Sequence, residues 1–467
     1  MSKPLIHSFT MDGYHLVLDV NSGTLHAVNE LAARIIERVQ PPLAETAPEE
    51  LISALPKFDP ALIREAYGEV RSLVNEGTLF SEWDDRVRID YEHLPVKSLC
   101  LHVAHDCNMH CEYCFANSGN YHGKREIMDE ATAKAAIDFL FRASGSRHNL
   151  EVDFFGGEPL INPDVVKATV AYARENEKKY NKNVRFTLTT NGLALDREMA
   201  DYLNREMYNL VFSLDGRKST HEAMRHANDG SETYDRIMEN IRYCVEGRGD
   251  KSWYVRGTYT HNNLDFRNDV LALADAGLKH ISIEPVVMPA DSPLALTEDD
   301  LPALFREYER LAREIIRRNR RGRTTPPGMP FEFFHFSVDL NAGPCAYKRL
   351  KGCGSGTEYL AVAPNGDLYP CHQFVGKKDF LLGSVYDGIT HPEHKQQFCR
   401  SAVSENEPCR DCFAKYFCSG GCAASNFNVN GDLKKPYEIG CKLQRKRLEC
   451  ALLIQAITAF DREERRS

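Results

Sequence analysis

The sequence lacks the features that mark membrane, secreted and nucleic-acid-binding proteins. It has no run of about eighteen apolar residues that could form a transmembrane helix. Its first residues, MSKPLIHSFT, do not show the basic-then-apolar order of a signal peptide. The net charge of −9 is opposite to the basic excess of nucleic-acid binders. We therefore expect a cytoplasmic protein with no membrane and no nucleic-acid partner.

Cysteine, by contrast, is abundant. The 467 residues include 15 cysteines. The cytoplasm keeps thiols reduced, so disulfides are a poor explanation for this number. Ligation of a metal or an iron–sulfur cluster explains it better. A chain of this length also predicts more than one domain.

The pattern along the chain divides it into three regions. Residues 1–92 contain no cysteine. They predict a hairpin from YHLVLDV and TLHAV, then three helices, then a short strand at 77–80. Residues 93–325 alternate apolar strands with amphipathic helices. Residues 326–467 are rich in glycine and cysteine and have too little periodic apolar sequence to build a core without metal staples.

The middle region predicts a parallel sheet covered by helices. Its expected strands are SLCLHVA, LEVDFFG, VRFTLTT, NLVFSLD, WYVRGTYT and HISIEPVV. Six strand–helix units fall short of a closed barrel of about eight, so the expected fold is α/β with a partial (β/α)6 barrel. Chemistry in such folds lies at the carboxyl ends of the strands.

A three-cysteine motif follows the first of these strands. CNMHCEYCFA places Cys107, Cys111 and Cys114 in the pattern C-x3-C-x2-C. Structural zinc sites usually have four ligands, and no fourth cysteine or histidine follows at zinc-finger spacing. Three thiolates on a [4Fe-4S] cluster would leave one iron open.

This motif resembles the signature of radical S-adenosylmethionine (SAM) enzymes, in which SAM completes the open iron. Tyr113 matches the aromatic residue of that signature, and Phe115 follows it. The resemblance extends to FFGGEPL, TTNG and SLDG, which end the next three strands, and to later arginines. It implies that SAM is bound by Tyr113, Phe115, Gly156, Gly157, Glu158, Pro159, Thr190, Asn191, Ser213, Asp215, Arg225 and Arg256.

The C-terminal cysteines resemble the seven-cysteine SPASM pattern, which carries two auxiliary [4Fe-4S] clusters. The resemblance implies that one complete cluster is held by Cys409, Cys412, Cys418 and Cys441, and the other by Cys353, Cys371 and Cys422. Cys345 could be the fourth ligand of the second group. Alternatively, that iron is open and accepts a cysteine of the substrate.

From IHSFTMDGYHLVLDVNSGTLHAVN through CGSGTEYLAVAPNGDLYPCHQFVG, the whole chain resembles the maturases of SCIFF (six cysteines in forty-five) peptides. That resemblance implies three [4Fe-4S] clusters, thioether crosslinks in a cysteine-rich precursor peptide, and a leader peptide bound by a winged-helix-like N-terminal domain as an added strand. It also implies a low-potential electron donor such as flavodoxin or ferredoxin, in an anaerobic setting. The N-terminal unit could instead be structural or a dimerisation element.

Two other functions remain open from the sequence. Anaerobic sulfatase maturases share the SPASM pattern, but carry an aspartate where this chain has His372. His372 therefore becomes the candidate substrate-facing catalytic residue. A non-catalytic electron-transfer protein would explain the cysteines but not the GGEP, TTNG and SLDG strand ends.

Overall fold

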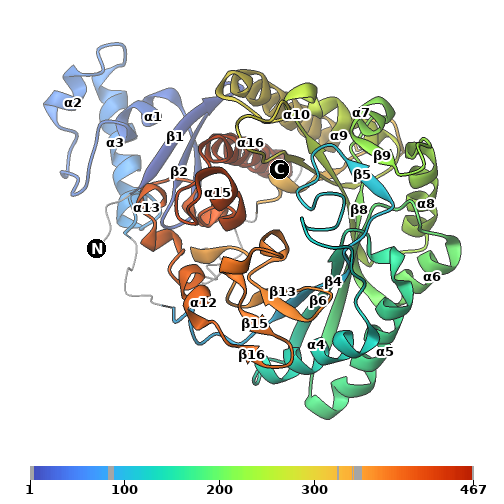
Figure 1. Cartoon of the computed structure of the whole chain (residues 1–467). Coiled ribbons are helices and arrows are strands. Elements are labelled where there is room, and N and C mark those ends of the chain that lie inside the picture. Colours follow the sequence, from blue (N-terminus) through green and yellow to red (C-terminus); the bar gives the residue numbers. More distant parts are fainter. Residues whose placement is uncertain (1–4, 83–88, 323–324, 339, 341–349, 465–467) are drawn as a thin grey trace.

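The computed structural model describes residues 5–82, 89–322, 325–338, 340 and 350–464 (Figure 1). Their strands form sheets of three, eleven and two strands. The largest sheet curves through the body of the molecule, and helices cover its outer face (Figure 1).

The N-terminal region forms a small antiparallel sheet with three helices on one face. The strands are β1 (Ile6–Met11), β2 (Tyr14–Asp19) and β3 (Leu25–Val28), with β2 in the centre. The helices are α1 (Glu30–Ile36), α2 (Glu49–Ser53) and α3 (Pro60–Asn75). The sequence predicted only β2 and β3 as strands. The strand expected at 77–80 is wrong, because these residues form turns and bends.

Local sequence explains the boundaries of this unit. The Asn29 side chain accepts a hydrogen bond from the backbone N–H of Ala32, and Asp59 caps α3 in the same way. On the sheet, alternate residues point to opposite faces. Val17 packs against the unit's own helices, whereas Leu18 packs against the C-terminal helix. The sheet is therefore buried on both faces.

The eleven-stranded sheet contains all six strands predicted for the barrel. They are β4 (Ser98–Ala104), β6 (Asn149–Gly156), β7 (Asn183–Thr190), β8 (Met207–Ser213), β10 (Ser252–Tyr259) and β11 (His280–Pro285). All their pairings are parallel. The predicted α/β class with a parallel sheet is confirmed.

Helices on the outer face connect the strands. They are α4 (Glu130–Ala143), α5 (Pro163–Tyr180), α6 (Arg197–Glu206), α7 (Lys218–Met224), α8 (Tyr234–Glu246), α9 (Phe266–Asp275) and α10 (Leu301–Arg321). Their apolar faces join the strands in one continuous core. The burial of this core holds the strand ends in fixed positions.

The C-terminal region extends the same sheet on both sides. β12 (Glu332–Phe333) pairs with β11, and β13 (Tyr359–Val362) pairs with β4, both in parallel. Antiparallel strands then follow: β14 (Asp367–Tyr369), β15 (Gly383–Ser384) and β16 (Gly388–Ile389). The region thus shares a sheet with the barrel, and its boundary near residue 326 stays a prediction.

The remaining helices are α12 (Pro392–Cys399), α13 (Glu407–Arg410), α14 (Lys415–Cys418), α15 (Ala423–Asn430) and α16 (Glu438–Glu464). The long helix α16, dark red in Figure 1, lies along α10 and also contacts β2 and β3. In the described residues, no helix combines the length and apolar character needed to cross a bilayer.

Candidate active site

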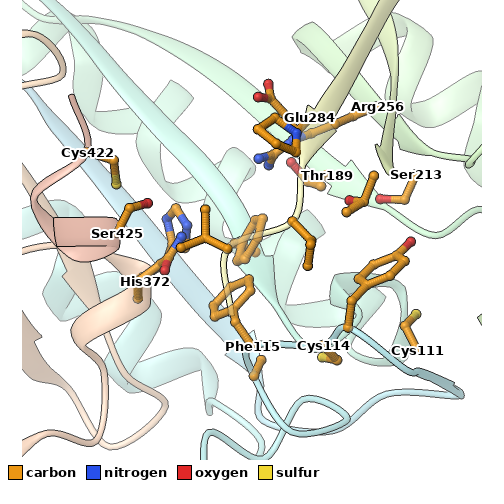
Figure 2. Close-up of a pocket in the computed structure, with 18 of the residues that line it drawn as sticks. Cys111, Cys114, Phe115, Thr189, Ser213, Arg256, Glu284, His372, Cys422 and Ser425 are labelled. Carbon is orange, nitrogen blue, oxygen red and sulfur yellow. The ribbon is translucent and has the colours of Figure 1, made fainter. Parts of the chain in front are cut away.

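A cavity of about 550 Å³ opens at the carboxyl ends of the barrel strands. Its walls come from the strand ends, from the loop after β4, and from the C-terminal region. Figure 2 shows Cys422 and Ser425 on one side, Cys111 on the other, and His372 and Phe115 between them. The cavity is therefore shared by two regions that lie far apart in the sequence.

The loop after β4 brings Cys107, Cys111 and Cys114 together on the cavity wall. A two-stranded ladder of β5 (Met109–Cys111) and β9 (Arg225–Ala227) holds the middle of this loop. The Asn228 side chain donates to the backbone oxygen of Cys107 at 2.8 Å. The loop is thus fixed by the protein chain itself.

The three thiols suit a metal cluster better than a free state. Burial raises the pKa of Cys107 to about 12, and Glu158 adds to the rise. Burial also raises the pKa of Cys111 to about 11. Cationic iron would offset this cost, because iron binds the thiolate form. The Asn191 amide also lies 3.7 Å from the Cys107 sulfur, as a hydrogen-bond donor to a cluster ligand would. The donor set fits a [4Fe-4S] cluster.

The loop continues into an unusual backbone segment. Asn117, Ser118, Tyr121 and His122 all have positive φ angles, as does Gly119. Non-glycine residues rarely adopt this conformation, and they occur most often at functional sites. The segment folds back so that Gly119 lies against Gly157 at the end of β6.

The GGEP turn after β6 is built for close backbone approach. Gly156 has a φ of 126°, which only glycine adopts readily. Two hydrogen bonds tie the turn to the cysteine loop: Gly157 N–H to the Ala104 oxygen at 2.8 Å, and Glu158 N–H to the Asp106 oxygen at 2.9 Å. The turn and the cysteine loop therefore form one rigid unit.

Glu158 is a buried carboxylate on the cavity wall, with only 1% of its surface exposed. It accepts hydrogen bonds from the Thr190 hydroxyl at 2.8 Å and from the Asn191 backbone N–H at 2.7 Å. Burial nevertheless raises its pKa to about 7. A cationic ligand beside it would favour the ionised form.

The end of β8 supplies a second polar group. Tyr113 donates a hydrogen bond from its hydroxyl to Asp215, and Arg225 donates to the Tyr113 hydroxyl at 3.1 Å. The backbone N–H of Thr258 also donates to Asp215, at 3.1 Å. Asp215 does not line the cavity, and acts by fixing Tyr113 and Arg225, which do.

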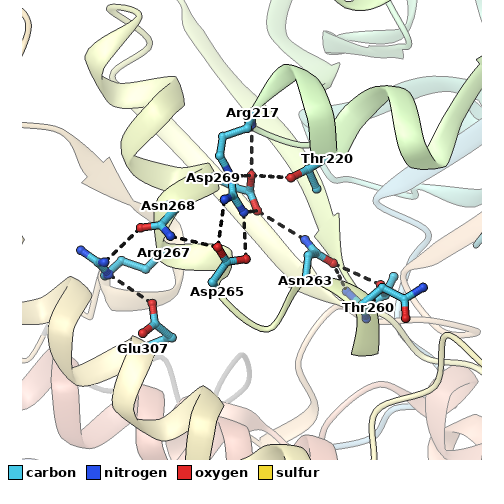
Figure 3. Close-up of polar contacts among 10 residues, drawn as sticks. Arg217, Thr220, Thr260, Asn263, Asp265, Arg267, Asn268, Asp269 and Glu307 are labelled. Carbon is cyan, nitrogen blue, oxygen red and sulfur yellow. Dashed lines mark hydrogen bonds and ion pairs between the residues drawn. The ribbon is translucent and has the colours of Figure 1, made fainter.

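Behind this group, a polar network holds the turn that follows β8 (Figure 3). Asp269 accepts from the Arg217 side chain at 2.7 Å and from the Thr220 hydroxyl at 2.9 Å. Arg217 also pairs with Asp265 at 2.8 Å. Gly216 has a φ of 108° and packs directly on Asp269. The network thus sets the path of the chain between Asp215 and α7.

The C-terminal cysteines lie in two groups. The thiols of Cys422 and Cys353 each contribute to the raised pKa of Cys371, after burial, which is the largest cause. The other group is coupled in the same way and consists of Cys409, Cys412, Cys418 and Cys441. The resemblance implied the same two groups as cluster ligands, and that role stays a prediction. Cys345 lies outside the described residues.

His372 faces the cavity between two aromatic rings. Its ring centre lies 5.5 Å from that of Phe115 and 5.0 Å from that of Phe155. Burial lowers its pKa to about 4, and Arg256 lowers it further. With this pKa the imidazole is neutral at pH 7. His372 directly follows Cys371 in the sequence.

The structure brings nearly all the sequence-predicted SAM contacts to this cavity. All of them except Asp215 line it: Tyr113, Phe115, Gly156, Gly157, Glu158, Pro159, Thr190, Asn191, Ser213, Arg225 and Arg256. Sequence reasoning missed Glu284 and Arg447, which line it too. Glu284 is the second-last residue of β11, so its position near a strand end was an available signal. Arg447 lies on a helix, where no local pattern marks it.

Four other cysteines do not line the cavity: Cys100, Cys244, Cys399 and Cys450. Cys244 and Cys450 are buried in the main core. Cys100 lies near Tyr359 and Cys371. All of the cysteines described in the structure are free of disulfide bonds.

Comparison with known proteins places this geometry in a family context. Residues 101–271 match the family model of the Radical SAM superfamily. The radical SAM cyclopropyl synthase TigE of Paramaledivibacter caminithermalis is 20% identical over 75% of this chain and 72% of its own length. A cysteine-type anaerobic sulfatase-maturating enzyme of Clostridium novyi is 22% identical over 70% of this chain and 88% of its own.

Two solved structures share the fold. Native anSMEcpe with bound AdoMet has a TM-score of 0.63 and 17% identity, covering 78% of this chain and 100% of its own. Streptococcus suis SuiB bound to precursor peptide SuiA has a TM-score of 0.51 and 16% identity, covering 93% of this chain and 99% of its own. These likenesses show a common fold that extends beyond the barrel.

Proposed function

We propose, from the premise that residues 101–271 form a radical SAM domain, that this chain is a radical SAM enzyme that crosslinks a peptide. The product would be a thioether between a cysteine sulfur and a carbon of another residue in a ribosomally made, cysteine-rich precursor. One observation carries the proposal: the three-cysteine loop and the C-terminal Cys422 and His372 line the same cavity. A peptide in that cavity could contact both.

The chain's own residues would hold the cofactors. A radical SAM domain binds a [4Fe-4S] cluster and SAM, which together supply a 5′-deoxyadenosyl radical that removes a hydrogen atom from a C–H bond. Cys107, Cys111 and Cys114 would ligate the cluster. Glu158 would pair with the SAM ammonium group. Ser213 and Arg225 would bind polar oxygens of SAM, and Phe115 would help exclude water from the radical.

The net reaction is a two-electron oxidation of the peptide. One hydrogen atom leaves the acceptor carbon for the 5′-deoxyadenosyl group, the thiol proton leaves to a base, and a C–S bond replaces the C–H and S–H bonds. One electron enters from a low-potential donor such as flavodoxin or ferredoxin. One electron would leave to an auxiliary cluster, which the C-terminal cysteines would hold. His372 faces the cavity and is our candidate for the base.

The C-terminal region would be a SPASM domain with two auxiliary [4Fe-4S] clusters. Cys409, Cys412, Cys418 and Cys441 form a set of four, which is complete for a cluster. Cys353, Cys371 and Cys422 form a set of three. The fourth ligand of this second set is either Cys345 or a cysteine of the substrate.

The N-terminal unit, residues 1–92, would recognise the leader of the precursor. Its sheet has β2 in the centre, so β1 and β3 are the two edges at which an extended peptide could add as a strand. SuiB, which is bound to a precursor peptide in its solved structure, aligns over 93% of this chain. This breadth supports a peptide substrate. We place the reaction in the cytoplasm of an anaerobic cell.

A sulfatase-maturase-like reaction is the second candidate, because the relative from Clostridium novyi aligns over most of this chain. That reaction would oxidise one cysteine or serine side chain of a protein and join no residues. The two products differ in chemistry: a thioether resists thiol alkylation, whereas a carbonyl product reacts with a hydrazide.

Anaerobic reconstitution tests the proposal. Three [4Fe-4S] clusters predict about twelve irons per chain, and a count of about four would contradict the auxiliary clusters. Reduction with SAM should release 5′-deoxyadenosine; no release would indicate an electron-transfer protein. Cys345→Ala should lose one cluster if Cys345 is a ligand, and keep the full count if a substrate cysteine completes that site.

A further inference from the structure

Two arginines line one wall of the cavity, and some of their guanidinium N–H groups have no hydrogen-bond acceptor among the described residues. Arg256 projects from β10, is exposed and lines the cavity, and its side chain has no hydrogen bond or ion pair to any described residue. Arg447 projects from α16 with only 6% of its surface exposed. Its Nη2 has no partner among the described residues. Buried guanidinium N–H groups are rarely left unpaired.

The neighbours of Arg447 hold its guanidinium in one position. Its Nε donates to the Tyr308 hydroxyl at 2.8 Å, and its Nη1 lies 3.4 Å from His335 Nδ1. Since Nδ1 accepts there, the ring proton lies on Nε2, which is 3.3 Å from Glu284. These contacts fix the guanidinium in place, so the unpaired nitrogen is held rather than free to find another partner.

The charges on this wall do not balance. The charge of Glu284 raises the pKa of Arg447, and the charges of Arg256 and Arg447 lower the pKa of Glu284. Burial raises the pKa of Glu284, but His335, Arg256 and Arg447 outweigh burial and hold that pKa well below its ordinary value. Burial, followed by the charge of Arg447, lowers the pKa of His335. Among the described residues of this wall, two guanidinium groups therefore face the one carboxylate of Glu284.

We propose that Arg256 and Arg447 bind a carboxylate of the substrate peptide, an aspartate or glutamate side chain or a C-terminus. An anion would supply a partner for the buried Nη2 of Arg447, which is costly to leave unpaired, and would pair with the exposed Arg256 as well. The planar donors of a guanidinium also match the two oxygens of a carboxylate. The proposal rests on the proposed function, and adds that the peptide carries an acidic group near the reacting residues.

The resemblance assigned Arg256 to SAM, whose carboxylate is the other source of an anion, and the proposal departs from that assignment. Arg256 lies beside Ser213 in the register of β10 and β8. Arg447, however, lies on the C-terminal helix and contacts His335, which follows β12. Arg225 is already placed beside the cysteine loop for the SAM carboxylate. A peptide group that reaches across the cavity fits the Arg256–Glu284–Arg447 wall better.

The experiment is an anaerobic affinity selection on the reconstituted full chain saturated with SAM. The probe is a library of short random peptides, each with one fixed cysteine. The variants are Arg256→Gln and Arg447→Lys, the second chosen because it keeps a buried cation. Arg185→Gln is the matched control, since Arg185 lies at the opposite end of the sheet and stacks on Tyr208. Binding of radiolabelled SAM is measured for every variant.

We expect the wild type and Arg185→Gln to enrich acidic peptides, and Arg256→Gln to lose that enrichment. Loss of one charge-assisted hydrogen-bonded pair should weaken binding of an enriched peptide about tenfold. Arg447→Lys should weaken it too, because an ammonium lacks the guanidinium fork. For both variants, SAM affinity should change by less than about twofold, well below the tenfold loss expected for the peptide.

Two outcomes would overturn the inference. In one, the wild type shows no preference for acidic peptides. In the other, Arg256→Gln loses SAM affinity about tenfold, which would assign the wall to the carboxylate of SAM. Failure of the proposed function gives a different result: acidic peptides bind in an Arg256-dependent way, but turnover removes no hydrogens from them and forms no thioether.

Discussion

Gly157→Ala tests whether the GGEP turn and the cysteine loop are one unit. A Cβ on Gly157 would overlap the backbone oxygen of Asp106 and lie 2.7 Å from the Asp106 carbonyl carbon and 2.9 Å from Gly119 Cα. Ordinary contacts of this kind are 3.4–4 Å. All these neighbours are backbone atoms, so no side chain can rotate away. The φ of Gly157 is not positive, and the cost is therefore steric alone.

The structure gives the size of this effect. Relief of the overlap requires Asp106 to move by roughly 1 Å, which costs about 1–3 kcal/mol as overpacking. The shift would also break the bond from Glu158 N–H to Asp106, worth about 1 kcal/mol. We expect the free energy of unfolding to fall by about 2–4 kcal/mol, the sum of both costs. Cys107 follows Asp106 directly, so reconstitution should also lose about one cluster of four irons.

The assay is urea unfolding of the cluster-free protein, followed by iron counting after anaerobic reconstitution. Gly68→Ala is the matched control. Gly68 lies in α3 with no heavy atom near its Cβ position, so alanine should stabilise the protein by about 0.5–1 kcal/mol. The reasoning is refuted if Gly157→Ala unfolds at the wild-type urea concentration and keeps its full iron.

Three further predictions follow from buried groups. Asp269→Asn should lower the free energy of unfolding by about 3 kcal/mol, because Asp269 is fully buried beside a guanidinium. Asp265 is a half-exposed carboxylate, so Asp265→Asn should lower it by about 1 kcal/mol or less in the same urea assay. Equal losses would contradict the role of burial. Burial and then Arg225 lower the pKa of His221 to about 3, so its stabilising effect is full above the unfolded-state pKa of about 6.5 and is lost as pH falls toward the folded-state value. From about pH 7.5 to 5.5 the wild type should therefore lose about 1 kcal/mol more than His221→Asn, and parallel pH curves would contradict this. Cys441→Ala should lose about four irons after reconstitution, whereas Cys450→Ala, a buried core thiol, should lose none.

The parts of the fold that follow local rules could be predicted from the sequence. The six barrel strands are rich in apolar residues, and the pattern locates them to within a few residues. The β5–β9 ladder was missed, because three-residue strands such as Met109–Cys111 carry no readable periodicity. The strand β1 was missed for a similar reason: its residues are mostly half-buried and show no clear alternation.

The same distinction between local pattern and tertiary packing applies to the candidate site. Motifs at successive strand ends, such as Glu158 and Asn191, converge because parallel strands end on one edge of the sheet. Arg447 could not be found in this way, because its place on the cavity wall depends on how α16 packs against the barrel. Spacing alone also does not separate Cys418 from Cys422, although they belong to different groups.

Helix α16 joins the N-terminal unit to the wall of the cavity. Leu448 and Leu452 of this helix share a core with Leu18 of β2, while Arg447 and Cys441 of the same helix line the cavity. Removal of the N-terminal unit would thus expose the apolar side chains of a helix that also lines the cavity. Exchange of such units between enzymes, by recombination or by engineering, would succeed only when the donor sheet presents apolar side chains that match this helix.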